Sequence, residues 1–303
     1  LKQILDKNKI NKKQSLEIKK IVKKIKKFHD WFIKYRDPKR TGLVSILHPW
    51  ESGYDNSPIW DEPMKKVVVE KNIKYKRADN KLINPDHRPL DIDYDRYVTI
   101  KNNLRKSNYN PKKLYKSSLF NVVDVGFNSI FLRANKDLVS ILKNFNLDTL
   151  SISKYIKITE KNILKLFDKK KGNFFSLDIK NKKKIEIPSI TNYFILFADL
   201  NNRQINNKLI KNLKRHNKKE KYFFSSIKPN HKSFEEKRYW RGPVWINCNW
   251  IIYKGLKNKD YLFSKKIKNL TIKLIEKKGI YEYYSCKNGK PMGASNFSWS
   301  AAL

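Results

Sequence analysis

Apolar residues recur at helical spacing along most of this chain, and this spacing limits its fold more than any other feature. The apolar face of one long helix is marked by Leu16, Ile18, Ile21, Val22, Ile25, Phe28, Phe32 and Tyr35. The same period predicts further helices over residues 127–142, 152–167, 189–199, 205–213, 243–256 and 262–274. Alternating strand patterns are short, as at residues 173–178. The chain is therefore predicted to be all-α.

The loops between these helices differ in length and composition. Residues 144–151 form a short link, whereas residues 36–93 form the longest non-helical stretch and are rich in Trp, Tyr and Pro, which favours an ordered loop. Helix pairs joined by alternately short and long loops fit a toroid of helical hairpins whose long loops gather at one end. A plain bundle would have shorter links. Because the composition does not shift along the chain, we predict one domain over residues 1–303.

The charge of the chain allows two interpretations. Its 68 Lys and Arg against 28 Asp and Glu give a net charge of +40, which is typical of proteins that bind nucleic acid or another polyanion. However, Lys, Asn and Ile are enriched together, and all three have AT-rich codons. A nucleic-acid binder has no reason to collect Ile and Asn, so we favour compositional drift.

Metal, disulfide and membrane signals are weak. Cys248 and Cys286 lack metal-ligand spacing, as do the five His. A disulfide is allowed but not implied. No apolar run approaches the roughly 20 residues of a membrane span. The chain starts at Leu1 and stops at Leu303 in mid-pattern, so we expect a fragment of a longer, cytoplasmic protein.

Residues 48–61 differ from the lysine-rich chain around them. No Lys or Arg occurs between Leu47 and Met64. The segment instead gathers aromatic and ionisable side chains around turn-forming residues: His48, Trp50, Glu51, Asp55, Trp60 and Asp61. Carboxylates beside aromatic faces can hold a sugar ring and protonate its leaving oxygen. We therefore predict a site with carbohydrate chemistry.

Two further segments, residues 239–250 and 281–299, repeat this mixture. Together with residues 48–61 they hold six of the seven Trp. A single cluster of this kind more often packs in a core than contacts a ligand. Three clusters, each with ionisable groups and each beside a predicted helix end, favour a sugar site in which aromatic faces stack on the ring and polar side chains bond its hydroxyls.

These segments also resemble a known family. Residues 48–61 resemble the motif before the catalytic acid in glycoside hydrolase family 63 and the related mannosylglycerate hydrolases, and are more distantly similar to the Glu-Ser-Gly-Trp-Asp of family 37 trehalases. Residues 239–245, Tyr-Trp-Arg-Gly-Pro-Val-Trp, resemble a second motif of the same enzymes. Residues 282–284 and 297–299 resemble their closing Glu-Tyr-Tyr and Phe-Ser-Trp-Thr motifs. The order matches, and the resemblance extends from about residue 20 to the end.

The resemblance implies an (α/α)6 barrel and an inverting exo-acting hydrolase of an α-glucoside or α-mannoside, such as mannosylglycerate, glucosylglycerate or an oligosaccharide. It implies Asp55 as the general acid and Glu282 as the general base, with carboxyl groups about 6.5–9.5 Å apart to leave room for a water. The resemblance further implies substrate contacts at Trp50, Glu51, Asn56, Trp60, Asp61, Tyr239, Trp240, Arg241, Gly242, Trp245, Tyr283, Phe297 and Trp299.

The residues themselves leave the acid open. A general acid must stay protonated near neutral pH, which burial or a neighbouring carboxylate can provide. Asp55 has Glu51 and Asp61 nearby in sequence. Glu51 is the main alternative, and only the family motif favours Asp55.

Departures from the family pattern keep other functions in view. Ile59 stands where relatives usually carry Arg, which affects leaving-group contacts, and Ser285 and Cys286 replace an Asp-Pro, which affects how Glu282 is held. The chain is also short for twelve helices, so its first helices are expected to lie outside it or the ring to be incomplete. One alternative is therefore a catalytically inactive sugar-binding relative.

A basic polyanion-binding protein is the other alternative. It would interleave lysines with aromatic residues, whereas here the two are segregated. We expect a small carbohydrate substrate, no nucleic acid, no membrane, no metal and no organic cofactor, and leave the oligomeric state open.

Overall fold

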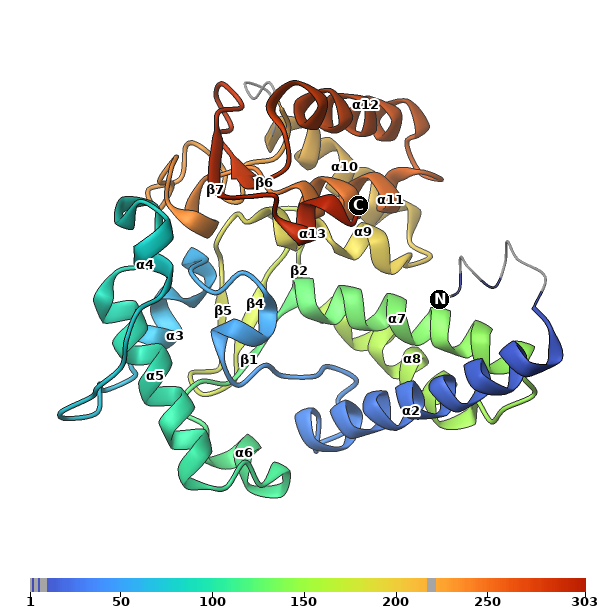
Figure 1. The fold of residues 1–303 in the computed structure, drawn as a ribbon. Helices are drawn as coiled ribbons and strands as arrows, with labels where there is room; N and C mark the ends of the chain where they lie inside the picture. Colours follow the sequence, from blue (N-terminus) through green and yellow to red (C-terminus); the bar gives the residue numbers. More distant parts are fainter. Residues whose placement is uncertain (1, 3–4, 6–9, 217–221) are drawn as a thin grey trace.

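The computed structural model describes residues 2, 5, 10–216 and 222–303 (Figure 1). Its longer helices are α2 (Lys12–Arg36), α5 (Asp91–Lys106), α7 (Val125–Asn144), α8 (Leu150–Ile163), α10 (Arg203–His216), α11 (Ile246–Leu256) and α12 (Tyr261–Lys278). Its shorter α-helices are α3 (Asp61–Lys65), α4 (Asp79–Leu82), α6 (Pro111–Ser117), α9 (Ile195–Ala198) and α13 (Ser298–Ala301). The 3-10 turns are η1 (Pro49–Ser52), η2 (Pro58–Trp60), η3 (Pro85–His87), η4 (Leu164–Leu166), η5 (Ile190–Tyr193) and η6 (Tyr239–Arg241). The prediction of a mainly helical chain is confirmed.

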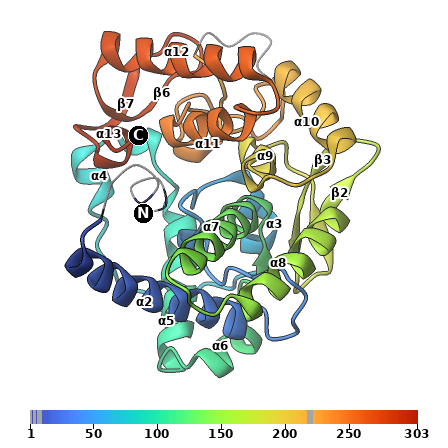
Figure 2. The same cartoon turned by 90° about the vertical axis from the view of Figure 1, so that its right-hand side faces the viewer.

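Helices from α7 onwards form two layers. The inner helices α7, α9 and α11 pack on one another in succession, while α8 packs on α7 and α12 packs on α11. Figure 2 shows α8, α10 and α12 outside this inner row. Successive helices thus alternate between inside and outside, as expected for a toroid of helical hairpins. The irregular segments and strands gather on the left of Figure 1, at one end of the helices.

Most of the predicted helices are present, with one exception. The helix expected over residues 189–199 is divided into η5 and the short α9, which ends where Asp199 adopts a left-handed conformation with φ 57°. The helix expected over residues 243–256 begins only at Ile246, because Val244 first pairs with Tyr284 as an isolated β-bridge. Residues 36–93 are an ordered connection that contains several short helical turns, as expected.

Helices α5 and α6 were missed by the sequence analysis. The buried side of α5 carries Tyr97, Val98, Ile100 and Leu104. Three of these are β-branched or aromatic, with weak helix propensity, although the Asp residues of the first turn favour a helix start. Burial against the rest of the molecule therefore outweighs a weak local preference.

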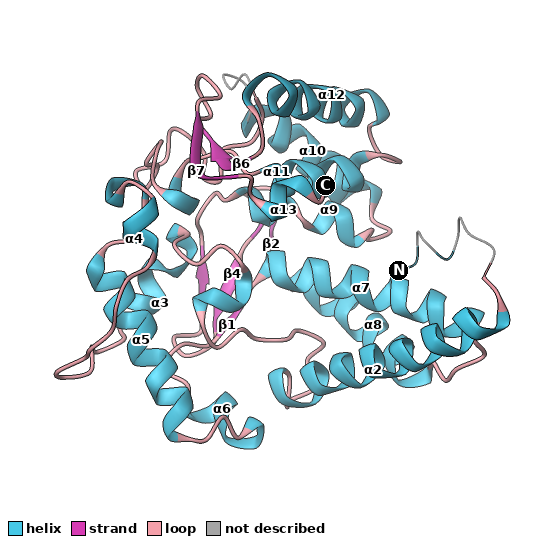
Figure 3. Ribbon diagram, viewed as in Figure 1, coloured by secondary structure: helices cyan, strands magenta, loops and turns pink. Residues whose placement is uncertain are grey.

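Within the part of the chain that the structure describes, the strands form three small antiparallel sheets (Figure 3). Their bounds are β1 (Val122–Val123), β2 (Phe167–Asp168), β3 (Asn173–Phe174), β4 (Ser176–Asp178), β5 (Lys183–Ile185), β6 (Tyr281–Tyr284) and β7 (Pro291–Ser295). The strand candidate at residues 173–178 is confirmed as β3 and β4. The β6–β7 hairpin was missed, because Tyr-Glu-Tyr-Tyr has no alternating pattern.

Many aromatic residues of the three sequence segments are buried in the core. Trp60, Trp240, Trp245 and Tyr283 are among the largest fully buried side chains. Both cysteines are buried free thiols, so no disulfide forms between them. Across residues 10–216 and 222–303, together with residues 2 and 5, the helices are all too short or too polar to cross a membrane.

Candidate active site

The segment around Asp55 is a chain of tight turns. The His48 side chain accepts a hydrogen bond from the backbone N–H of Trp50 and so caps η1. Gly53 ends η1 with φ 77°, and a Cβ there would lie 3.3 Å from the ring of Trp299. The positive φ favours glycine here, and a larger residue would also crowd the ring of Trp299. The end of the chain therefore meets the turn that precedes Asp55.

Asp55 is half-buried between this turn and α5. Its backbone carbonyl accepts a hydrogen bond from the hydroxyl of Tyr97, at 2.7 Å. Burial, assisted by the charges of Glu282 and Asp79 and opposed by the charge of Arg88, raises the pKa of Asp55 to about 6. A carboxyl group with this pKa keeps part of its proton near neutral pH, as a general acid requires.

Glu282 lies on β6 and is only 3% exposed. Arg88 donates to both of its oxygens, Nη1 to Oε1 at 3.2 Å and Nη2 to Oε2 at 3.3 Å. The backbone N–H of Ala294 on β7 donates to Oε2 at 3.1 Å. A Cβ on Gly293 would lie 2.5 Å from Oε2, so the carboxylate is seated against the neighbouring strand.

The two carboxyl groups act on one another although they come from opposite ends of the sequence. The charge of Glu282 raises the pKa of Asp55. Burial, followed by the charges of both carboxylates, raises the pKa of Tyr239. The guanidinium of Arg88 lies 4.7 Å from the centre of the Tyr239 ring. Asp55, Glu282, Arg88 and Tyr239 therefore form one electrostatically coupled cluster, called here the carboxylate cluster.

Arg88 was missed by the sequence analysis. It follows η3 in the long connection, where nothing in the local pattern separates it from the other cations of this basic chain. Only the three-dimensional structure shows that it is buried and bound to Glu282.

Comparisons with known proteins decide the family. Residues 5–300 match the model of the mannosylglycerate hydrolase MGH1-like glycoside hydrolase domain. The chain belongs to this family. It is 40% identical to a mannosylglycerate hydrolase of Thermus thermophilus over 92% of its own length and 68% of that relative. It is 32% identical to mannosylglycerate hydrolase MGH1 of Selaginella moellendorffii over 94% of its length and 59% of that relative.

Solved structures support the same family assignment. The chain superposes with a TM-score of 0.96 and 37% identity on a GH63 mannosylglycerate hydrolase of Thermus thermophilus in complex with Tris and D-glycerate, covering all of this chain and 73% of that one. A structure of the same enzyme with glucose gives a TM-score of 0.95. The chain therefore has the (α/α)6 fold of these glycoside hydrolases. It spans between three-fifths and three-quarters of the length of these relatives.

Within this family fold, Glu51 is bound to other parts of the protein. Its Oε1 accepts from Arg36 at 2.6 Å and its Oε2 accepts from the backbone N–H of Leu47 at 2.8 Å. The Glu51 carboxylate is therefore directed at Arg36 and at the backbone of Leu47, and Glu51 does not line the cavity that Asp55 lines.

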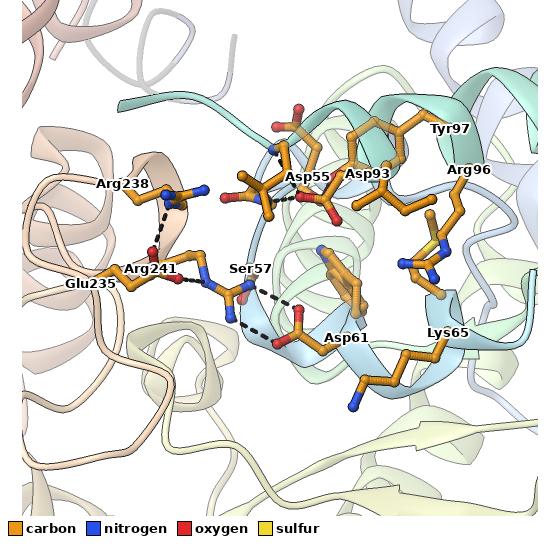
Figure 4. Close-up of a pocket in the computed structure, with 15 residues that line it drawn as sticks. Asp55, Ser57, Asp61, Lys65, Asp93, Arg96, Tyr97, Glu235, Arg238 and Arg241 are labelled. Atoms are coloured by element: carbon orange, nitrogen blue, oxygen red, sulfur yellow. Dashed lines mark hydrogen bonds and ion pairs between the residues drawn. The ribbon is translucent and has the colours of Figure 1, made fainter. Parts of the chain in front are cut away.

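The other predicted polar residues lie around a cavity of about 230 Å³ next to Asp55 (Figure 4). Arg241 donates to both oxygens of Asp61 at 2.9 and 2.8 Å. Asn56 donates to Asp93 at 3.2 Å. Glu282 does not line this cavity. Gly242 lies outside it, packed so closely on the backbone of Glu235 that a Cβ would clash.

The predicted aromatic residues divide into buried and exposed ones. Trp240 and Trp245 stack with ring centres 3.8 Å apart. The ring centre of Trp245 also lies 4.9 Å from that of the buried Tyr283. Trp50 and Trp299 are 43% and 41% exposed, which leaves them free faces. The buried rings of Trp240, Trp245 and Tyr283 pack on one another, whereas Trp60 lines the cavity next to Asp55. The exposed rings can contact a ligand directly.

The remaining predicted residues and departures are placed as follows. Phe297 is half-buried and precedes α13. Ile59 is buried in the main core. Ser285 donates to Glu236 at 2.9 Å, and Cys286 is buried behind it. Among the described residues, no group of His, Cys, Asp and Glu side chains is arranged to hold a metal ion.

Proposed function

We propose that this chain carries the catalytic site of an inverting exo-acting α-glycosidase that hydrolyses an α-mannoside or α-glucoside of glycerate. Asp55 is the general acid and Glu282 the general base. The observation that carries this proposal is that Arg88 holds both oxygens of Glu282 while its guanidinium lies 4.7 Å from the ring centre of Tyr239, beside the half-buried Asp55, whose pKa is raised to about 6. The two carboxyl groups differ in environment, as the two roles require.

The proposed reaction is a single displacement at the anomeric carbon. Asp55 donates its proton to the glycosidic oxygen as the bond from that oxygen to the sugar breaks. A water attacks the opposite face of the ring, and Glu282 accepts its proton. The free sugar leaves with inverted configuration, and the aglycone leaves as an alcohol. Trp50 and Trp299 supply aromatic faces beside the ring.

Charge supports an acidic aglycone. Relatives of this chain are named mannosylglycerate and glucosylglycerate hydrolases, and a glycerate group carries a carboxylate. Arg88 is the buried guanidinium of the carboxylate cluster, and its Nε lacks a hydrogen-bond partner within residues 10–216 and 222–303. The positive charge of this guanidinium acts on Asp55 and favours a carboxylate in the neighbouring aglycone.

Release of reducing sugar tests the proposal. The panel contains mannosylglycerate, glucosylglycerate, and neutral α-mannosides and α-glucosides. We expect turnover of at least one glycerate conjugate, and losses of ~10³-fold for Asp55→Asn and Glu282→Gln, since general acid–base catalysis contributes about 10²–10⁴-fold. Glu276→Gln, an exposed acid on α12, is the control and should match the wild type. Wild-type turnover by Asp55→Asn or Glu282→Gln would contradict the assigned roles.

An inactive wild-type chain that still binds these sugars would instead support the sugar-binding relative. The altered residues Ile59, Ser285 and Cys286 are the specific reason to keep this second candidate in the same panel.

A further inference from the structure

We propose that Tyr54, anchored on Asp124 at the start of α7, is a positioning residue that sets where the carboxyl group of Asp55 lies. The inference rests on the proposed role of Asp55 as general acid. Tyr54 immediately precedes Asp55, is 3% exposed, and donates its phenolic hydrogen to Oδ2 of Asp124.

Asp124 is a buried anchor with several donors around it. It is fully buried and caps α7, where its Oδ2 also accepts from the backbone N–H of Phe127 at 2.6 Å. Its Oδ1 accepts from the hydroxyl of Ser176 on β4 at 2.7 Å. A buried carboxylate with its donors in place is held rigidly, because losing any of them leaves a polar atom unsatisfied.

The ring of Tyr54 is fitted closely to the first turn of α7. A Cβ on Gly126 would lie 2.6 Å from the Tyr54 hydroxyl oxygen, so the phenol reaches Asp124 only because residue 126 is glycine. On its other side, the ring stacks on Trp60 with centres 5.5 Å apart, and Trp60 Nε1 donates to the carbonyl of Tyr54 at 2.8 Å. The ring therefore has little room to move.

Asp55 is thus held from two directions. The Tyr54 phenol ties the preceding residue to α7, and the Tyr97 hydroxyl on α5 holds the carbonyl of Asp55 itself. A general acid must lie within hydrogen-bond reach of the leaving oxygen, and a displacement of about 1 Å can lower a rate ~100-fold. Removing the Tyr54 hydroxyl releases one of the two attachments without touching Glu282.

The test compares two leaving groups in Tyr54→Phe. A glycerate leaving group needs a proton from Asp55. Fluoride leaves the α-glycosyl fluoride of the same sugar as the anion: the C–F bond breaks, the water C–O bond forms, and Glu282 takes the water's proton. We expect kcat on the glycerate conjugate to fall ~10- to 100-fold with KM nearly unchanged, and kcat on the fluoride to stay within about 3-fold.

Tyr155→Phe is the matched control. The Tyr155 hydroxyl also donates to a buried carboxylate, Asp37 Oδ2 at 3.0 Å, but from α8 and away from the residues around Asp55. It should lose comparable stability and keep its activity on both substrates. If Tyr54→Phe is not recovered folded, Asp124→Asn removes the same acceptor charge and should give the same difference between leaving groups.

The outcomes separate the inference from the proposed function. Wild-type kinetics, or equal losses on both substrates, in Tyr54→Phe would overturn the positioning role while Asp55→Asn remains inactive on the glycerate conjugate. Wild-type turnover by Asp55→Asn, or an inactive wild-type chain, would overturn the proposed function and the positioning role with it.

Discussion

The segment that carries Asp55 and the hairpin that carries Glu282 hold their carboxyl groups in different ways. Asp55 is held through its backbone, by Tyr97 and by the anchored Tyr54, and its pKa is raised to about 6 chiefly by burial. Glu282 is held through its own oxygens, by Arg88 and by a backbone N–H. The raised pKa of Asp55 lets its carboxyl group keep a proton, as a general acid must, whereas the ion pair with Arg88 fixes the position of the Glu282 carboxylate. The supports of the two residues therefore differ as their proposed roles do.

The largest expected effect is on the turnover of Asp55 and Glu282 variants when the leaving group of the substrate is changed. Asp55→Asn should lose ~10³-fold on the glycerate conjugate and recover most of its turnover on the α-glycosyl fluoride, because fluoride needs no proton. Glu282→Gln should lose ~10³-fold on both, because water must be activated in each case. Steady-state kinetics on both substrates measure this. A Glu282→Gln variant rescued by fluoride, with Asp55→Asn not rescued, would reverse the assignment.

Next in size is the loss of the cation on the hairpin side. Arg88→Met leaves the buried carboxylate of Glu282 unpaired, and breaking a buried ion pair costs about 3–5 kcal/mol. Denaturant unfolding measures the loss. The control is Arg133→Met, which removes a half-exposed ion pair with Asp137 on α7 and should cost about 1 kcal/mol or less. Equal costs for the two variants would show that Arg88 does not hold Glu282 as described.

The pKa of Asp55 predicts a smaller, pH-dependent effect. Its value in the folded protein, about 6, exceeds its ordinary value of 3.8, so the ionised form is disfavoured in the folded state. Stability should therefore fall as pH rises from about 4 to 6 and then level off. Asp55→Asn should be more stable than the wild type by about 3 kcal/mol at pH 8 and nearly equal to it near pH 4.

The pH dependence of activity should also be set by the ionisation of Asp55. The wild-type kcat/KM should decline as pH rises through about 6, where Asp55 loses its proton. A flat profile from pH 5 to 8, or an Asp55→Asn variant without any pH-dependent gain in stability, would contradict the raised pKa.

The smallest expected effect on stability and activity comes from substituting Ser285, which follows β6. Ser285→Ala removes the hydrogen bond to Glu236 and two long ones that the hydroxyl accepts from the backbone N–H groups of Lys287 and Asn288. The loss should be about 1–2 kcal/mol, and kcat should stay within about 3-fold because Arg88 and Ala294 still hold Glu282. Thermal unfolding and steady-state kinetics measure both. A loss of activity approaching that of Glu282→Gln would mean that Ser285 supports the base directly.

Sequence reasoning located the strongly periodic helices and the three segments, because both depend on local patterns. Helices α2, α7, α8, α11 and α12 have continuous apolar faces and were predicted close to their observed bounds. Helix α5 was missed because its formation depends on burial rather than on propensity. The β6–β7 hairpin was missed because its first strand is short and lacks alternation.

The residues of the proposed site were named from sequence motifs, whereas the residues that hold them in place were not. Asp55 and Glu282 were named from the family resemblance, and the structure adds their coupling. Arg88 and Asp124 were not named, since a single cation in a basic chain and a single Asp before a helix have no distinctive signal. Their importance comes from long-range contacts, with Glu282 and Tyr54 respectively.

The anomer released from an α-linked glycerate conjugate tests the central claim most directly. In this account the acid and the water activated by the base lie on opposite faces of the sugar, so an α-linked substrate gives a β-sugar. Proton NMR recorded in the first minutes of the reaction should therefore show the β-anomer before mutarotation. Initial release of the α-anomer would mean that the configuration is retained, and would contradict direct attack by water activated at Glu282.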